Sequence, residues 1–174
     1  MTLQKLTLIL GGAASGKSAF AEGLVTESGL SPVYVATAQV WDAEMADKVA
    51  CHRSMRGDGW RTVEEPLDMA RALAGVTAKD AVLIDCATLW LTNVILSDAD
   101  LALAEAGLFA SIDACPAPVV IVSNEVGQGI VPDNVLSRRF RDAQGALNQR
   151  LAAQAGLVVA VMAGLPLVWK GTLR

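Results

Sequence analysis

Short apolar runs alternate along this chain with longer segments of mixed character. Each run is rich in Val, Ile and Leu and is flanked by turn or polar residues. Because strands that are covered on both faces lose the apolar–polar alternation of half-exposed strands, the pattern predicts buried strands. The predicted strands are Leu6–Leu10, Val33–Thr37, Ala81–Asp85, Val119–Ser123 and Leu157–Met162, and the stretch "WRTVEE" can add one more.

The segments between these runs have helical character and similar spacing along the chain. They are Lys17–Glu27, Ala43–Arg56, Leu67–Leu73, about Asp98–Ala114, and Asn134–Ala155. Strands that alternate with helices predict an α/β fold, with a mostly parallel sheet flanked by helices. A length of 174 residues without repeats or linkers suits one domain spanning residues 1–174.

A phosphate-binding motif follows the first predicted strand. Gly11 is followed by four residues and then by Gly16, Lys17 and Ser18, which matches G-x-x-x-x-G-K-[ST] between a strand and a helix. Glycines let the backbone curl so that successive N–H groups face phosphates, and the helix N-terminus adds positive potential. We expect Lys17 to reach the outer phosphates and Ser18 to ligate Mg²⁺.

The second candidate element of the site is acidic: the predicted strand "AVLID" ends at Asp85. The C-terminal ends of parallel strands line the ligand crevice of such sheets, so Asp85 is expected to hold Mg²⁺ there. The structural alternative is an acidic residue beside a turn. These features predict a P-loop nucleotide-binding domain, but they do not choose between a kinase, an ATPase and a switch.

Composition narrows the function classes. The chain is 53% hydrophobic with a mean hydropathy of +0.42, which predicts a packed core and not a disordered chain. Its net charge is −4, so it lacks the excess of Lys and Arg with which a general nucleic-acid binder neutralises phosphates. A local basic pocket is compatible with this balance.

The cysteines and the apolar runs bear on the compartment. The chain has three cysteines, Cys51, Cys86 and Cys115, an odd number with no C-x-x-C pair. Neither a disulfide framework nor a zinc site is therefore expected, and we predict a cytoplasmic protein. The apolar run near the N-terminus is too short for a secretory signal. The longest later run, "LVVAVMAGLPLVW", has about 13 residues and an internal Pro, so no membrane insertion is expected.

His52 is the only histidine, and its surroundings allow two interpretations. Met45, Val49, His52 and Arg56 fall on one face of the predicted helix, whose acidic start and basic end suit the helix dipole. An ordinary structural histidine fits that pattern. However, the preceding strand should end beside the phosphate loop, and Arg53 and Arg56 suit phosphate. A histidine there can act as a general base, a charge stabiliser or a nucleophile.

Several stretches together resemble one enzyme family over most of the chain. They are "GGAASGKS", "YVATAQVWDAEMADKVACHRSMRGDGWRTVEEP", "IDCATLWLTN", "SNEVGQGIVPDNVLSRRFRDAQGALNQRLA" and "GLPLVWK", in the family's order. The chain is similar to the bifunctional adenosylcobinamide kinases / adenosylcobinamide-phosphate guanylyltransferases of cobalamin biosynthesis. The combination of these motifs is far more specific than the phosphate loop alone.

The resemblance implies two reactions and a set of residues. ATP or GTP phosphorylates adenosylcobinamide, and GTP then transfers GMP to that phosphate through a GMP-histidine intermediate, giving adenosyl-GDP-cobinamide. The family histidine falls on His52, which with Lys17 is the expected catalytic pair. The family's GTP contacts fall on Gly11, Gly12, Ala13, Ala14, Ser15, Gly16, Lys17 and Ser18, on Ala36, Thr37 and Ala38, on Arg53, Ser54, Met55 and Arg56, and on Glu64 and Asp85.

The resemblance further implies a RecA-like P-loop fold and a homotrimer. One departure is Ala14, where the family's loop usually has Arg; the loop geometry should survive, while a cationic contact is lost. The block from Ser123 to Ala153 has no derivable catalytic role. Its arginines, Arg138, Arg139 and Arg141, fit either a solvated helix or a contact to the corrinoid phosphate or another subunit. Trp90 and Trp169 are expected to pack.

Two other interpretations stay open. The first is a P-loop switch or binding module without covalent chemistry, in which His52 is structural. The second is a simple small-molecule kinase without the guanylyl step.

Overall fold

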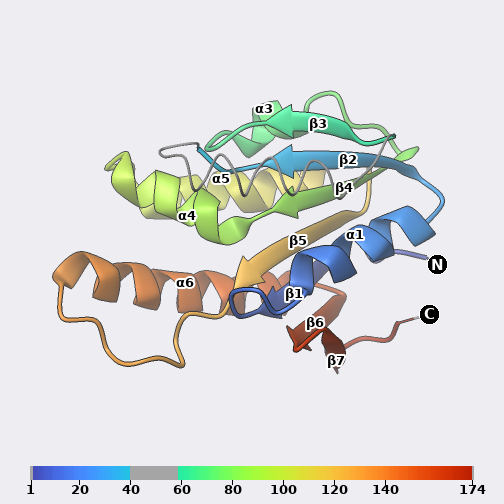
Figure 1. Ribbon diagram of the computed structural model, residues 1–174. Helices are drawn as coiled ribbons and strands as arrows, with labels where there is room; N and C mark the ends of the chain where they lie inside the picture. Colours follow the sequence, from blue (N-terminus) through green and yellow to red (C-terminus); the bar gives the residue numbers. More distant parts are fainter. Residues whose placement is uncertain (1, 40–58, 174) are drawn as a thin grey trace.

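One seven-stranded sheet organises the protein (Figure 1), in a computed structural model that describes residues 2–39 and 59–173. The strand order is β3-β2-β4-β5-β1-β6-β7, and only the β6–β7 pairing is antiparallel. The strands are β1 (Leu6–Gly11), β2 (Ser31–Ala36), β3 (Arg61–Glu64), β4 (Asp80–Asp85), β5 (Val119–Asn124), β6 (Leu157–Met162) and β7 (Leu165–Lys170). The predicted α/β class is therefore confirmed.

Helices cover both faces of this sheet. They are α1 (Lys17–Glu27), α3 (Met69–Leu73), α4 (Ala87–Leu96), α5 (Leu101–Ala114) and α6 (Val135–Gln154). One core joins α3, α4, α5 and α6 to strand residues such as Leu8 and Ile121. The opposite core joins α1, on the other face of the sheet (Figure 1), to Ile9, which follows Leu8, and to Val120, which precedes Ile121. Successive strand residues thus feed two cores, which explains the continuous apolar runs.

Helix α4 was not predicted from the sequence. Its segment "ATLWLTNVIL" carries no polar stripe, because seven of its ten residues are buried against the sheet and neighbouring helices. Trp90 is 1% exposed and its Nε1 donates to Leu67 O at 2.9 Å, so its predicted packing role is confirmed. The helix expected from Asp98 begins at Leu101, with the Asp100 side chain as its N-cap.

Strand β7 was also missed. The run "LVVAVMAGLPLVW" is a hairpin in which Ala163 and Gly164 form the turn, both with positive φ (52° and 77°). Such two-residue turns match the twist of antiparallel strands. Trp169 on β7 is 62% exposed, so its predicted packing role is wrong within the described chain. The predicted helix Ala43–Arg56 lies outside the described residues. Among those residues, no helix is both long and apolar enough to cross a bilayer.

A buried ion pair links α5 to α6. Glu105 has a side chain that is 3% exposed, and it pairs with Arg150, whose side chain is 50% exposed. Burial raises the pKa of Glu105, and the Arg150 guanidinium opposes that rise. A carboxyl with a raised pKa in the folded protein destabilises the fold as the pH rises through that pKa, so the arginine matters most when Glu105 is ionised.

We therefore predict that Arg150→Ala lowers the free energy of unfolding by about 1–3 kcal/mol at neutral pH, a range below that for fully buried pairs because Arg150 is half exposed. The deficit relative to the parent should shrink when the pH is lowered from neutral to about 4, because protonation of Glu105, whose pKa is raised, removes the charge that Arg150 stabilises. Urea unfolding at both pH values measures it. In a Glu105→Gln background, Arg150→Ala should have a small effect on the free energy of unfolding, of the same size at both pH values. If the deficit with Glu105 present were as large at acidic pH as at neutral pH, the mechanism would be contradicted.

Candidate nucleotide site

The phosphate loop joins the end of β1 to the start of α1. Gly16, with φ 91°, precedes the helix, and no side chain caps the first turn, so its backbone N–H groups are available to an anion. The loop residues Gly12 to Ala14 are exposed, and Lys17 Nζ folds back to donate to Gly12 O at 3.0 Å. The structure thus brings together the glycines, the helix end and the cation that the motif predicted.

Close packing explains both glycines of the motif. A Cβ on Gly11 would overlap Ser15 Oγ and lie 2.6 Å from Val161 O, and a Cβ on Gly16 would lie 3.1 Å from Gly164 Cα. Gly164 also donates its N–H to Ser15 O at 2.8 Å. The β6–β7 turn therefore braces the phosphate loop from outside, a contact that the motif alone does not reveal.

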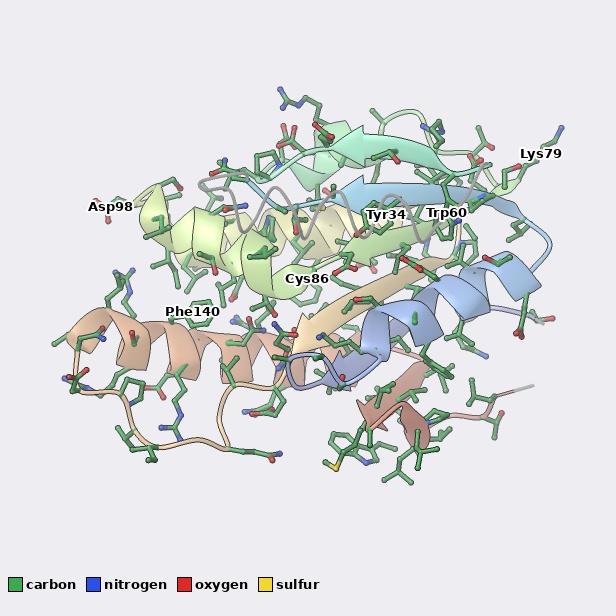
Figure 2. The ribbon with its side chains drawn as sticks, in the orientation of Figure 1. Tyr34, Trp60, Lys79, Cys86, Asp98 and Phe140 are labelled. Atoms are coloured by element: carbon green, nitrogen blue, oxygen red, sulfur yellow. The ribbon has the colours of Figure 1, made fainter. Side chains whose placement is uncertain are left out.

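Asp85 ends β4 at the same edge of the sheet. Its Oδ2 is buried and has no hydrogen-bond partner among the described residues. Cys86 follows it and is the N-cap of α4 (Figure 2). Burial, reinforced by the Asp85 charge and partly offset by Lys17, raises the pKa of the Cys86 thiol to about 12. The charges of Asp85 and Lys17 therefore both affect the buried Cys86 thiol. With this raised pKa, the thiol is unsuited to act as a nucleophile.

Thr37 binds the end of β2 to the end of β4. It is fully buried, and its Oγ1 both donates to Cys86 O and accepts from Cys86 N at 2.8 Å. Its backbone N–H donates to Asp85 O at 3.2 Å. The side chain of this predicted nucleotide contact is thus occupied by the backbone of Cys86, while Ala36 and Ala38 beside it are half-buried.

The end of β3 lies next to these residues. Glu64 is exposed and pairs in register with Ala36, which in turn pairs with Asp85. The predicted contacts from β2, β3 and β4 therefore share one edge of the sheet. The predicted residues His52, Arg53, Ser54, Met55 and Arg56 lie outside the described residues.

Two positioning residues were missed at the sequence level. Asn93 on α4 donates from Nδ2 to Thr37 O at 2.8 Å and to Pro66 O at 3.1 Å, which ties together the segments after β2 and β3. A lone amide in an apolar helix was the available signal.

Glu65, directly after β3, is the second of these residues. Burial alone would raise the pKa of Glu65, but hydrogen bonds from the Asp68 and Leu67 N–H groups, and the Arg71 guanidinium, hold that pKa below its usual value.

Two arginines of α6 contact the loop that precedes the helix. Arg138 Nη1 donates to Pro132 O at 2.9 Å and to Asp133 O at 2.7 Å, and Arg141 Nη2 donates to Gly127 O at 2.6 Å. These bonds fold the loop against its own helix. They are a structural use of arginine that neither sequence-based interpretation included.

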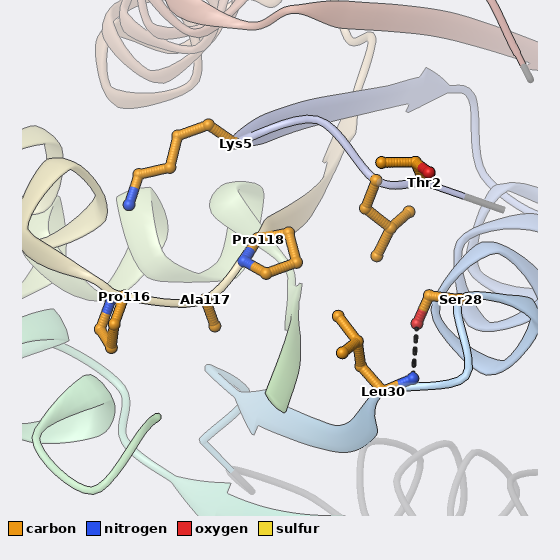
Figure 3. Close-up of a pocket in the computed structure, with 8 residues that line it drawn as sticks. Thr2, Lys5, Ser28, Leu30, Pro116, Ala117 and Pro118 are labelled. Carbon is orange, nitrogen blue, oxygen red and sulfur yellow. Dashed lines mark hydrogen bonds between the residues drawn. The ribbon is translucent and has the colours of Figure 1, made fainter. Parts of the chain in front are cut away.

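Two hollows lie at opposite edges of the sheet. One, of about 360 Å³, adjoins the phosphate loop and is also lined by Glu125, Gln128, Met162 and Trp169. The other, of about 430 Å³ (Figure 3), lies beyond the N-terminal ends of β1 and β5. Lys5, which lines it, donates to Cys115 O. Only the first adjoins residues that the sequence assigned to nucleotide binding.

Comparisons with known proteins identify the family of the chain. The family model described as cobinamide kinase / cobinamide phosphate guanyltransferase matches residues 7–169. The bifunctional adenosylcobalamin biosynthesis protein CobP of Pseudomonas aeruginosa is 46% identical over 94% of this chain and 96% of its own length. The bifunctional adenosylcobalamin biosynthesis protein CobU of Escherichia coli (strain K12) is 40% identical, over 92% of this chain and 97% of its own length.

Solved structures agree on the fold alone. The flagellar accessory protein FlaH from Methanocaldococcus jannaschii has a TM-score of 0.53 and 12% identity, with 99% of this chain and 83% of that chain covered. The RadB recombinase has a TM-score of 0.50 and 16% identity, with 91% and 74% covered. The family model and the relatives at 40% identity and above show that the chain belongs to the cobinamide kinase / cobinamide phosphate guanyltransferase family.

Proposed function

We propose that this protein phosphorylates adenosylcobinamide with ATP or GTP and then transfers GMP from GTP to the new phosphate, giving adenosyl-GDP-cobinamide and pyrophosphate. The observation that carries the proposal is that the phosphate loop, Lys17 and Asp85 all lie at the C-terminal edge of the sheet, where sheets of this kind bind ligands in a crevice, in a member of this family. Both reactions start from a nucleoside triphosphate, which this crevice suits by its backbone N–H groups and its cation.

Two residues of the crevice fit Mg²⁺. Asp85 offers a buried carboxylate oxygen without a partner among the described residues, and Ser18 lies in the first turn of α1. Carboxylate and hydroxyl oxygens are the hard ligands that Mg²⁺ prefers. When bound with the nucleotide, the ion would neutralise charge on the outer phosphates. Lys17 would exchange its bond to Gly12 O for the phosphates.

His52 is the proposed GMP carrier, on the strength of the family resemblance and of its being the single histidine in the chain. A ring nitrogen attacks the α-phosphorus of GTP, a phosphorus–nitrogen bond forms, and the bond to pyrophosphate breaks. An oxygen of adenosylcobinamide phosphate then attacks the same phosphorus, and the histidine leaves. Arg53 and Arg56 are proposed to hold phosphates during both steps.

We also propose a homotrimer in the cytoplasm. Apolar side chains are exposed on the β6–β7 hairpin and on the segment that leads into the first turn of α6, and two different apolar surfaces on one chain suit a cyclic assembly. They are Met162, Leu165, Leu167 and Trp169, and Ile130, Val131, Val135 and Leu136. Cys86 and Cys115 are free buried thiols, which is compatible with a reducing compartment.

Protein labelling tests the carrier. Incubation with GTP that is radioactive at the α-phosphate should give a protein-bound label that is labile in acid and stable in alkali, as for a phosphorus–nitrogen bond. GTP labelled at the γ-phosphate should leave none by this route, and His52→Asn should take up none from either. Equal labelling of His52→Asn would refute the assignment, and an unlabelled parent protein that still phosphorylates adenosylcobinamide would indicate a simple kinase.

Lys17→Ala tests the cradle. Loss of a charged contact to the outer phosphates should weaken triphosphate binding by about 10-fold or more and impair both reactions. Calorimetric titration with GTP measures the affinity. Lys79→Ala removes an exposed lysine just before β4, at the opposite edge of the sheet, and should bind as the parent does (Figure 2). Unchanged affinity and turnover in Lys17→Ala would contradict the cradle.

Light scattering after gel filtration tests the assembly. The parent should elute with the mass of three chains, and Leu167→Glu should elute smaller, because a charge on the exposed hairpin face would have to be desolvated at the contact. Leu103→Glu on α5 changes a leucine that is even more exposed but lies outside both surfaces, and it should leave the mass unchanged. A monomeric parent protein would overturn the proposed trimer.

A further inference from the structure

Strand β5 occupies a special place in the sheet. It lies between β1, which leads into the phosphate loop, and β4, which ends at Asp85. Asn124, its last residue, pairs in register with Gly11, and Val122 pairs with both Ile9 and Asp85 (Figure 1). Asn124 therefore stands two residues beyond the level of Asp85 and beside the first residue of the loop, although no motif assigned it to the site.

The register also decides which face Asn124 belongs to. Val120 and Val122 belong to the core under α1, so Asn124, two positions on, lies on the same face, as does Asp85 after Leu83. A Cβ on Gly11 would meet Ser15, so the phosphate loop folds over this face. Asn124, Asp85 and the loop thus share one side of the sheet.

The backbone around Asn124 is held on every side. Its N–H donates to Thr88 Oγ1 at 2.8 Å, and its carbonyl accepts from Asn148 Nδ2 at 3.1 Å. The next N–H, of Glu125, donates to Gly11 O at 3.2 Å. On the opposite face, the Ser123 hydroxyl donates to Asn148 Oδ1 at 2.6 Å. These contacts immobilise the strand end without using the side-chain amide of Asn124.

That amide carries an unmet hydrogen-bonding capacity. Asn124 Oδ1 is buried and has no partner among the described residues, as are Asp85 Oδ2 and Ser15 Oγ. An unpartnered buried polar atom costs about 1–3 kcal/mol, so three of them near one edge of the sheet indicate groups that a bound ligand, with its water and cation, would satisfy. The oxygens of Asp85 and Asn124 accept, so they suit water or a cation, whereas Nδ2 of Asn124 is a donor that can face a phosphate oxygen. An amide can donate to a phosphate oxygen without the repulsion that a carboxylate would exert.

We propose that the side-chain amide of Asn124 contacts the terminal phosphoryl group of a bound nucleoside triphosphate, donating from Nδ2 to a γ-phosphate oxygen while Oδ1 accepts from a water in the crevice. The inner phosphates are served by the loop N–H groups. The outer one emerges between Lys17 and Asp85, toward the strand that Asn124 ends. This inference rests on the proposed function, and it makes Asn124 the residue that separates a triphosphate from a diphosphate.

Nucleotide titrations test this inference without relying on turnover. The full-length protein is titrated calorimetrically with a non-hydrolysable β,γ-imido analogue of GTP and, separately, with GDP. Asn124→Ala should bind the triphosphate analogue about 10-fold more weakly, because one hydrogen bond to a charged group is lost, and should bind GDP as the parent does. Asn124→Asp, of the same shape, should lose more, because its carboxylate repels the γ-phosphate.

The controls separate this inference from the function on which it rests. Gln149→Ala removes an exposed amide on α6 and should bind both nucleotides as the parent does. Both Asn124 variants should melt near the parent temperature, since Oδ1 has no partner among the described residues. If the Asn124 variants bound the analogue and GDP with equally weakened affinity, or with unchanged affinity, the role of Asn124 would be overturned and the proposed function would stand. A parent protein that binds neither nucleotide would overturn the proposed function as well.

Discussion

The insertion of β5 between the loop strand and the Asp85 strand is the constraint on which the site depends. Six strands run parallel, so their C-terminal ends meet at one edge of the sheet. Because β5 separates β1 from β4, the phosphate loop and Asp85 stand two strand spacings apart, near 10 Å. That distance leaves room for the outer phosphates and a cation between them, where direct neighbours would pair with each other.

A frame of satisfied backbone groups surrounds the unsatisfied side chains of the crevice. Thr37 saturates the backbone of Cys86, Asn93 joins Thr37 to Pro66, and Gly164 braces the loop at Ser15. Each contact fixes a strand end or a turn, and none uses Asp85 Oδ2 or Lys17 Nζ. Rigid supports with free ligating atoms are the arrangement that electrostatic preorganisation requires.

The sequence predicted what depends on local pattern and missed what depends on register. The five main strands and α1 followed from apolar runs and from G-x-x-x-x-G-K-[ST]. Helix α4 was not predicted because it is buried on most sides and therefore has no polar stripe in its sequence. Strand β7 was not predicted because Ala163–Gly164 resembled an interruption within one apolar run and not a hairpin turn. The roles of Thr37 and Asn124 could not be predicted, since each depends on a neighbour more than 40 residues away, Cys86 for one and Gly11 for the other.

An acidic chain can still bind a polyanion because most of the attraction here comes from the backbone. The net charge of −4 opposes a triphosphate only at long range, where salt screens it. At contact, the loop N–H groups and the N-terminus of α1 present fixed partial charges that need no excess of basic residues. Ala14 fits this logic: its φ of 53° is a left-handed turn of the backbone, and the cradle keeps that geometry without the family's arginine. Lys17 is then the cation within the described loop whose position decides how well the outer phosphates are held. The neutral amide of Asn124, which ends β5 beside Gly11, would on our proposal contribute selectivity for the γ-phosphate more than charge.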